Sequence, residues 1–193
     1  MLMAISSEKK ELRAKLLAKL LSLTAEELKR RSDNVTERLS NLPLYKSAKV
    51  IMAYFPLKGE VAILGMIRKD LKSKRFCFPV MDVAKKELQV FEACNLEDDF
   101  VAGPFGVKQP SLERTKKVAI GEIDMIIVPA LAFDRKKNRL GRGAGFYDRF
   151  LKSVNPPTSK VGVAFDFQIC ENLPIHPPFD EKVDLIVSEH FII

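Results

Sequence analysis

The residues best suited to chemistry lie between Arg139 and Asp148, where three glycines alternate with other residues in RLGRGAGFYD. Glycines allow backbone N–H groups to converge on phosphate oxygens, and the N-terminus of a following helix adds partial positive charge. An arginine can also bind two phosphate oxygens through its planar fork. The basic side chains in and before this segment are Arg135, Lys136, Lys137, Arg139 and Arg142. The segment therefore predicts a phosphate-binding loop.

The glycine spacing at Gly141, Gly143 and Gly145 differs from both common nucleotide motifs. It lacks the final spacing of the dinucleotide fingerprint, and the chain contains no G-x-x-x-x-G-K-[ST] segment. By itself, the pattern also fits a basic turn that joins a strand to a helix. Asp148 favours the phosphate site, because a carboxylate directly after the glycines can cap the helix or help to hold Mg²⁺.

The longer segment VPALAFDRKKNRLGRGAGFYDRFL resembles the signature of the 5-formyltetrahydrofolate cyclo-ligase family, whose members are also called methenyltetrahydrofolate synthetases. Shorter matches occur on both sides of it. Residues 9–13 (KKELR) are similar to the K-x-x-L-R motif of the family, and Tyr54-Phe55-Pro56 with Glu60 is similar to its substrate segment. Towards the other end, Gln168, Leu173-Pro174 and Asp180 follow in the expected order. The resemblance thus covers nearly the whole chain.

The resemblance implies an ATP-dependent reaction that requires magnesium. 5-Formyltetrahydrofolate is cyclised to 5,10-methenyltetrahydrofolate, and ADP and phosphate are released. In the implied mechanism the formyl oxygen attacks the γ-phosphate, and the neighbouring nitrogen then displaces the phosphate from the activated intermediate. Such a reaction needs positive charge where the phosphate charge moves and close alignment of two substrates.

The resemblance also implies a role for each matching residue. The ATP-binding set is Lys9, Lys10, Glu11, Leu12, Arg13, Arg139, Leu140, Gly141, Arg142, Gly143, Ala144, Gly145, Phe146 and Tyr147. The folate-binding set is Phe55, Glu60, Arg142, Gly143, Ala144, Gly145 and Phe146. Arg142 is the implied catalytic residue, Asp148 and Asp180 are the implied magnesium ligands, and Asp134 is expected to fix the basic loop.

Structural interpretations of the same residues remain open. Lys9 and Arg13 also fit a solvated helix face, Glu60 also fits the first turn of a helix, and Asp180 also fits a turn. Phe55 could be an ordinary core residue. The chain departs from the family pattern at Asn138, Phe146 and Ser188, where glycine, tyrosine and threonine are frequent, and none of these changes removes a proposed phosphate or metal group.

The periodicity of apolar residues predicts the elements that carry these motifs. Helices are expected at 8–21, from the Thr24 cap to about Leu42 with Pro43 as the stop, at 62–71 and at 147–154. Strands are expected at 49–55, 75–80, 88–92, 123–133, 161–165 and 185–187, and a loop is expected at 95–117. This order predicts a single α/β domain over residues 1–193. Its three layers would be a mostly parallel sheet with helices on both faces, preceded by an N-terminal helical hairpin.

Composition restricts the possible partners. The 193 residues carry a formal charge of +7, which favours anionic partners such as nucleic acids or nucleotides. No nucleic-acid-binding motif occurs, so we expect small-molecule substrates rather than nucleic acid, namely ATP and a folate that can carry a polyglutamate tail. A different ATP-dependent transferase on the same fold would also fit the sequence. No apolar run is long enough to span a membrane, and the early charged residues do not fit a signal peptide. We therefore expect a cytoplasmic monomer with reduced cysteines.

Overall fold

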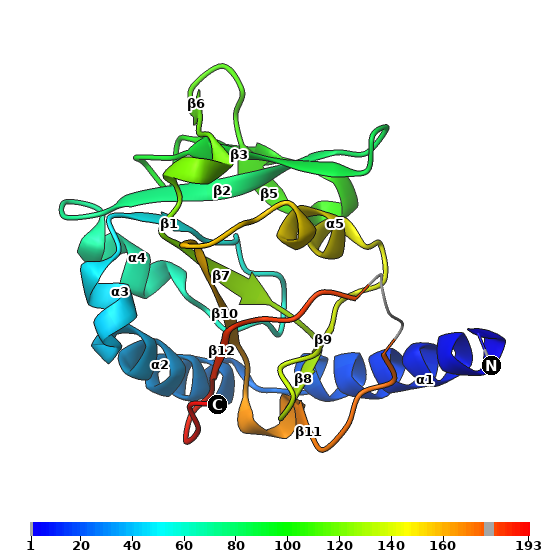
Figure 1. Cartoon of the computed structure of the whole chain (residues 1–193). Coiled ribbons are helices and arrows are strands. Elements are labelled where there is room, and N and C mark those ends of the chain that lie inside the picture. The colour runs from blue at the N-terminus through cyan, green and yellow to red at the C-terminus, as the bar shows by residue number, and fades with distance from the viewer. Residues whose placement is uncertain (1, 176–179) are drawn as a thin grey trace.

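The N-terminal half of the chain supplies most of the helices in the computed structural model, which describes residues 2–175 and 180–193 (Figure 1). The helices are α1 (Leu2–Leu21), α2 (Ala25–Asn41), α3 (Pro43–Ser47), α4 (Leu64–Asp70) and α5 (Phe146–Lys152), with short 3₁₀ helices at Pro104–Gly106, Ile120–Glu122 and Asp166–Gln168. Within residues 2–175 and 180–193, no helix is both long and apolar enough to cross a membrane.

The predicted boundaries of the first two helices have clear local causes. The backbone N–H of Glu27 donates to Thr24 Oγ1 over 3.1 Å, and the Thr24 N–H donates to Glu27 Oε2 over 3.0 Å, which confirms the predicted capping box. Pro43 ends α2 as predicted and also begins α3, because proline lacks the N–H that an interior helical position requires. Helix α1 begins at Leu2, six residues earlier than the apolar pattern suggested.

The main sheet has seven strands in the order β12-β10-β7-β1-β2-β3-β6. Pairing is parallel from β12 to β2 and antiparallel from β2 to β6, so the sheet is mostly parallel, as predicted. Its strands are β1 (Val50–Met52), β2 (Arg75–Asp82), β3 (Glu87–Glu92), β6 (Lys116–Lys117), β7 (Met125–Pro129), β10 (Ser159–Val163) and β12 (Leu185–Val187). The remaining short strands are β4 (Phe100–Ala102), β5 (Lys108–Pro110), β8 (Ala132–Asp134), β9 (Arg139–Leu140) and β11 (Ile169–Cys170).

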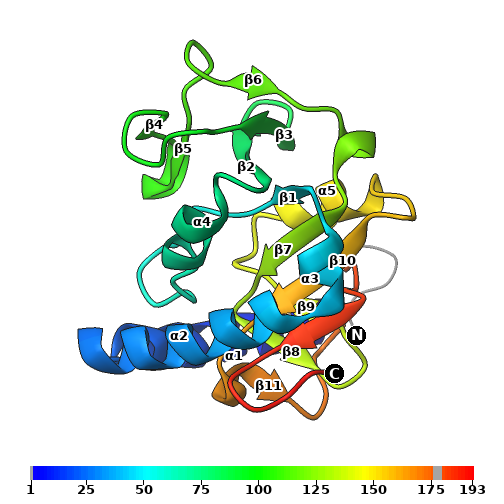
Figure 2. The ribbon, with the colours of Figure 1, turned by 90° about the vertical axis from the view of Figure 1, so that its left-hand side faces the viewer.

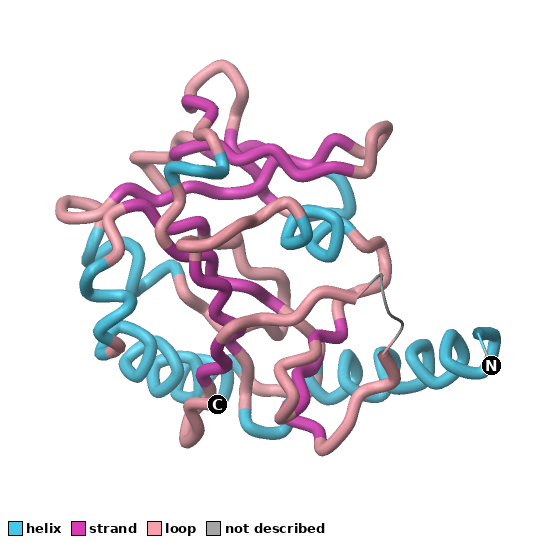
Figure 3. The backbone as a smooth tube through the Cα atoms, in the orientation of Figure 1, coloured by secondary structure: helices cyan, strands magenta, loops and turns pink. Residues whose placement is uncertain are grey.

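Two apolar clusters cover the two faces of this sheet, because successive side chains of a strand point to opposite faces. Ile51 of β1 faces the cluster that contains buried residues of α1 to α4, whereas Val50 and Met52 face the cluster that contains Phe150 and Leu151 of α5. Figures 2 and 3 show the helices on the outside of the central strands. The predicted three layers are confirmed.

Two predictions about strands were wrong. The apolar run at 123–133 forms two strands in different sheets, β7 and β8, because the chain turns after Pro129 and Leu131 N–H bonds back to Leu140 O. The expected loop at 95–117 contains β4, β5 and β6. In that segment, β4 and β5 pair with each other and β6 pairs with β3, so backbone hydrogen bonds formed by tertiary pairing override the glycine, proline and charge content.

The order in which the chain adds strands to the sheet reverses between β1 and β7. From β1 the chain adds β2 and β3 on one side, and it later returns to place β7 on the other side, followed by β10 and β12. At such a switch point, the connections that leave neighbouring parallel strands run to opposite faces of the sheet, as α4 and α5 do here. A crevice remains outside the carboxyl ends of the strands, where ligands bind in open α/β sheets. The segments that follow β1 and β7 are Ala53–Glu60 and Ala130–Asp148, which carry most of the predicted site.

Candidate active site

A cavity of about 400 Å³ opens at the carboxyl ends of β1 and β7. The segment Gly141–Asp148 forms one side of it, together with Glu60 and Arg139. The rest of the lining is largely apolar and comes from the segment after β1, from β2, β3 and the β4–β5 hairpin, through Tyr54, Phe55, Met81, Leu88, Phe105 and Val107. One cavity thus joins the phosphate-binding loop predicted from sequence to a surface suited to an aromatic molecule.

Asp134 holds the basic turn that leads into the glycine-rich loop, as predicted. Its Oδ1 accepts hydrogen bonds from the N–H groups of Lys136 and Asn138 over 2.9 and 3.0 Å, and its Oδ2 accepts one from Leu173 N over 3.1 Å. Lys137, rather than Asn138, has the positive φ, at 66°. The turn is therefore fixed from both ends by a buried carboxylate, which explains why Asn138 can stand where the family often has glycine.

The glycines of the loop occupy positions that a side chain would disturb. Gly143 and Gly145 have φ values of 109° and 71°, in the region that favours glycine, and Gly145 immediately precedes α5. A Cβ at Gly141 would lie 2.8 Å from Arg139 Nη1. Arg13 Nε of α1 donates to Gly141 O over 2.9 Å and so ties the first helix to the loop.

Arg139 is buried and points back towards the first turn of α5. Its Nη2 donates to Asp148 Oδ1 over 2.7 Å, and the two side chains are 3% and 19% exposed. Its guanidinium carbon lies 5.5 Å from the ring centroid of Tyr147. The Tyr147 hydroxyl is also buried and has no hydrogen-bond partner among the described residues. Burial, with a further contribution from the Glu60 carboxylate, raises the pKa of this hydroxyl, so it stays protonated and can donate to a ligand.

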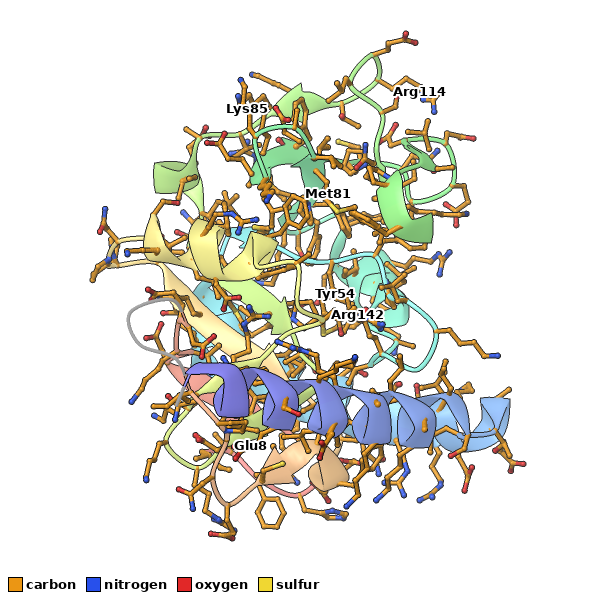
Figure 4. The ribbon with its side chains drawn as sticks, turned by 90° about the vertical axis from the view of Figure 1, so that its right-hand side faces the viewer. Glu8, Tyr54, Met81, Lys85, Arg114 and Arg142 are labelled. Atoms are coloured by element: carbon orange, nitrogen blue, oxygen red, sulfur yellow. The ribbon has the colours of Figure 1, made fainter. Side chains whose placement is uncertain are left out.

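Arg142 and Glu60 form an ion pair in the lining of the cavity. Arg142 Nε and Nη2 donate to Glu60 Oε1 over 3.1 and 3.0 Å, while Glu60 Oε2 accepts from Leu57 N over 2.9 Å. The Glu60 side chain is only 11% exposed, whereas that of Arg142 is 37% exposed. In Figure 4, Arg142 lies above α1 near Tyr54, and Met81 lies further from that helix. The residues expected to contact phosphate and folate are therefore adjacent.

The remaining residues of the motif at 9–13 are placed differently. Lys9 is buried and pairs with Asp180, Lys10 and Glu11 are exposed, and Leu12 packs against the core. Of this motif, Arg13 makes the direct contact with the glycine-rich loop. The side-chain assignments of the other four to ATP remain predictions.

Comparison with known proteins identifies the family of the chain. The sequence model of the 5-formyltetrahydrofolate cyclo-ligase family matches residues 5–189 of this chain. The chain belongs to that family. The 5-formyltetrahydrofolate cyclo-ligase of Haemophilus influenzae is 33% identical over 155 residues, which cover 79% of this chain and 83% of the relative. The mouse 5-formyltetrahydrofolate cyclo-ligase is 31% identical over 196 residues, with 96% and 95% covered.

Solved structures show the same fold. The NMR structure of Aquifex aeolicus 5,10-methenyltetrahydrofolate synthetase is 36% identical and superposes with a TM-score of 0.83, over 95% of this chain and 91% of that one. A 5,10-methenyltetrahydrofolate synthetase from Mycoplasma pneumoniae, at 24% identity, shares the fold with a TM-score of 0.76 over 95% and 99% of the two chains. The family resemblance drawn from the motifs is confirmed.

The acidic residues fit a metal that arrives with a nucleotide better than a resident metal. In residues 2–175 and 180–193, no group of three or more His, Cys, Asp or Glu side chains is arranged to hold a metal ion. Mg²⁺ is commonly bound by one or two carboxylates together with substrate phosphates. Asp148 lines the cavity beside the phosphate-binding loop, which suits that mode by position. Both aspartates are paired with a basic side chain, Asp148 with Arg139 and Asp180 with Lys9. The assignment of both aspartates to magnesium remains a prediction.

Sequence analysis of this cyclo-ligase family member missed several residues that line the cavity or brace its loop. Arg149 Nη2 donates to Ala144 O over 3.1 Å and so braces the loop from α5. The apolar wall formed by Met81, Leu88 and Phe105 gave no signal, because these residues look like ordinary strand or turn residues in sequence. Gln168 had a signal in the late motif, and its Nε2 donates to Ala130 O and Leu131 O over 3.0 Å, which secures the turn after β7.

Proposed function

We propose that this chain catalyses the ATP-dependent cyclisation of 5-formyltetrahydrofolate to 5,10-methenyltetrahydrofolate with release of ADP and phosphate. The observation that carries the proposal is the cavity in which an arginine-bearing glycine loop faces an apolar, aromatic wall. The first surface suits a triphosphate and the second suits a pterin with its aminobenzoyl ring. The names of the relatives support the same folate reaction.

In the proposed reaction, the formyl oxygen attacks the γ-phosphorus and ADP leaves with the electron pair of the broken P–O bond. The N10 nitrogen of the folate then attacks the formyl carbon, which closes the five-membered ring, and N10 loses its proton to solvent. Phosphate departs with the former formyl oxygen and the electron pair of the broken C–O bond, which leaves the methenyl product. The protein contributes alignment of the two substrates and positive charge from Arg142, Arg139 and Arg13 around the loop. Magnesium, when bound with ATP, would supply further neutralisation of the phosphate charge.

The pair between Glu60 and Arg142 gives each substrate a partner. The Glu60 carboxylate accepts hydrogen bonds only, so it suits the amino and ring N–H groups of a pterin. Arg142 suits the oxygens of the transferred phosphate. The two side chains bond to each other over 3.0 Å, which fixes them next to each other. We propose that the transferred phosphate and the pterin meet at this pair.

A spectroscopic assay tests the function directly. The purified protein is mixed with ATP, Mg²⁺ and 5-formyltetrahydrofolate, and the absorbance of the methenyl product is followed. Product should form with ATP and Mg²⁺ and fail to form when ATP is replaced by a non-hydrolysable analogue or when Mg²⁺ is chelated. No product from a protein shown to be folded would exclude this activity, and a different ATP-dependent transfer would then be the better hypothesis. Monomeric state, cytoplasmic location and a single domain remain predictions of the sequence.

A further inference from the structure

The charges that line the cavity do not balance. Five charged side chains contribute to its surface, namely Lys108, Glu60, Asp148, Arg139 and Arg142. Arg139 pairs with Asp148 and Arg142 pairs with Glu60. Within residues 2–175 and 180–193, the Lys108 ammonium forms neither an ion pair nor a hydrogen bond to another side chain or to the backbone. Among the described residues that line the cavity, Lys108 is therefore the charged residue without an oppositely charged partner.

Lys108 is held at the aromatic part of the cavity. It begins β5, where its Cα pairs with that of Ala102 in β4, and its Nζ lies 5.3 Å from the ring centroid of Phe55. Phe55 in turn packs against Phe100 of β4, with 5.0 Å between the ring centroids. An exposed lysine is common on any protein surface, but this one has its ammonium positioned over an aromatic side chain that also lines the cavity.

Lys108 and the two arginines line one cavity, and their surroundings differ. The two arginines are paired with carboxylates, whereas Lys108 lies over the ring of Phe55. Apolar residues, among them Met81 and Leu88, also line this cavity. A ligand that complements the part near Lys108 needs an aromatic body and an anionic group.

We propose that Lys108 binds a carboxylate of the glutamate tail of the folate substrate. This inference rests on the proposed function and deepens it, because it fixes the direction in which the folate lies. The formyl-bearing ring is placed at Glu60 and Arg142, and the glutamate lies at the β4–β5 hairpin. A carboxylate of the folate is favoured over a second phosphate because Lys108 lies over Phe55, in the aromatic part of the cavity that is proposed to hold the folate.

The test removes the charge from the protein and the carboxylates from the ligand in turn. Lys108→Met keeps most of the aliphatic chain over Phe55 and loses the ammonium, and Lys116→Met on the exposed strand β6 is the matched control. Binding of 5-formyltetrahydrofolate and of 5-formyltetrahydropteroate, which lacks the glutamate, is measured by calorimetry. Loss of a charge-assisted hydrogen bond predicts a roughly tenfold weaker affinity of Lys108→Met for the folate.

The same variant should bind the pteroate and ATP as the parent protein does, and Lys108→Arg should retain most of the folate affinity because it keeps the charge. Equal folate affinity in Lys108→Met would overturn the proposal. So would an equal loss for folate and pteroate, which would show that the lysine only shapes the cavity, or a loss confined to ATP. A parent protein that binds no folate would overturn both this proposal and the proposed function. Folate binding without product formation would contradict the proposed function alone.

Discussion

The two sides of the cavity are built in different ways. On the side of the glycine loop, each arginine already has a partner: Arg13 bonds to Gly141 O, Arg139 to Asp148 and Arg142 to Glu60. On the side of the β4–β5 hairpin, the Lys108 ammonium has no ion pair within the described residues, and Phe105 is 72% exposed. The loop side is preorganised by its own contacts, whereas the hairpin side offers groups that are exposed to solvent and that a ligand could cover.

This difference matches the tasks that the proposed reaction gives to each side. Charge moves on the phosphate during the reaction, so the groups that face it act best when they are fixed before the substrate arrives. The tail of the folate does not react, so the groups that face it contribute binding alone. Substitutions on the loop side should therefore affect turnover or folding, and substitutions on the hairpin side should affect affinity. Four further experiments test this contrast.

The largest effect is expected for Arg142→Ala. Removal of one preorganised group that faces transition-state charge lowers turnover by about 100- to 1000-fold, and we expect only a modest change in the Michaelis constant for ATP. Lysine at this position should restore part of the rate, because it keeps the charge and loses the planar fork. Steady-state kinetics at saturating ATP distinguishes the alternatives, with Arg114→Ala as the surface control. Normal turnover with weaker ATP binding would show that Arg142 has no part in the chemical step.

Asp148→Asn should lower stability. It leaves the guanidinium of Arg139, whose side chain is 3% exposed, without its anion, and such a loss costs about 2–4 kcal/mol in the free energy of unfolding. Asp33→Asn is the matched control, because its pair with Lys29 is 61% and 78% exposed and contributes at most about 0.5 kcal/mol. Urea denaturation measures both variants. Equal stability of the two would mean that the loop side is not held together by this pair.

Glu60→Gln should weaken folate binding by about tenfold, since a buried carboxylate that accepts two donors becomes an amide with one mismatched group. ATP affinity should change much less. Glu97→Gln, at an exposed pair with Arg68, is the control. Calorimetry of each substrate separately gives the result. If ATP and folate affinities fell together, Glu60 would act chiefly by holding Arg142 rather than by contacting the pterin.

The smallest effect is expected for Phe105→Ala on the hairpin side. The ring is 72% exposed and lies 6.5 Å from the ring centroid of Phe146, so its removal should change the free energy of unfolding by no more than about 0.5 kcal/mol. Folate affinity should fall about threefold through lost apolar contact. Denaturation and calorimetry on the same sample check both values. A large loss of stability would break the contrast between the two sides.

Local sequence determined much of this protein. The alternating glycines gave the loop, because positive φ at Gly143 and Gly145 needs residues without a Cβ. The hydroxyl at Thr24 and the carboxylate three residues later gave the start of α2, and the β-branched and apolar run at 185–187 gave β12. These features depend on backbone preferences and short-range hydrogen bonds, so a few neighbouring residues suffice to predict them.

Tertiary structure alone decided which of these residues meet. Arg142 and Glu60 are 82 positions apart, and Arg13 and Gly141 are 128 apart, so their contacts follow from the order of the strands rather than from any local pattern. The same order placed the switch point between β1 and β7 and brought Lys108 to the cavity from a segment that sequence described as a loop. The physical reason is that strand order and hairpin placement minimise exposed apolar surface and unpaired backbone groups over the whole chain, and no short stretch of sequence contains that information.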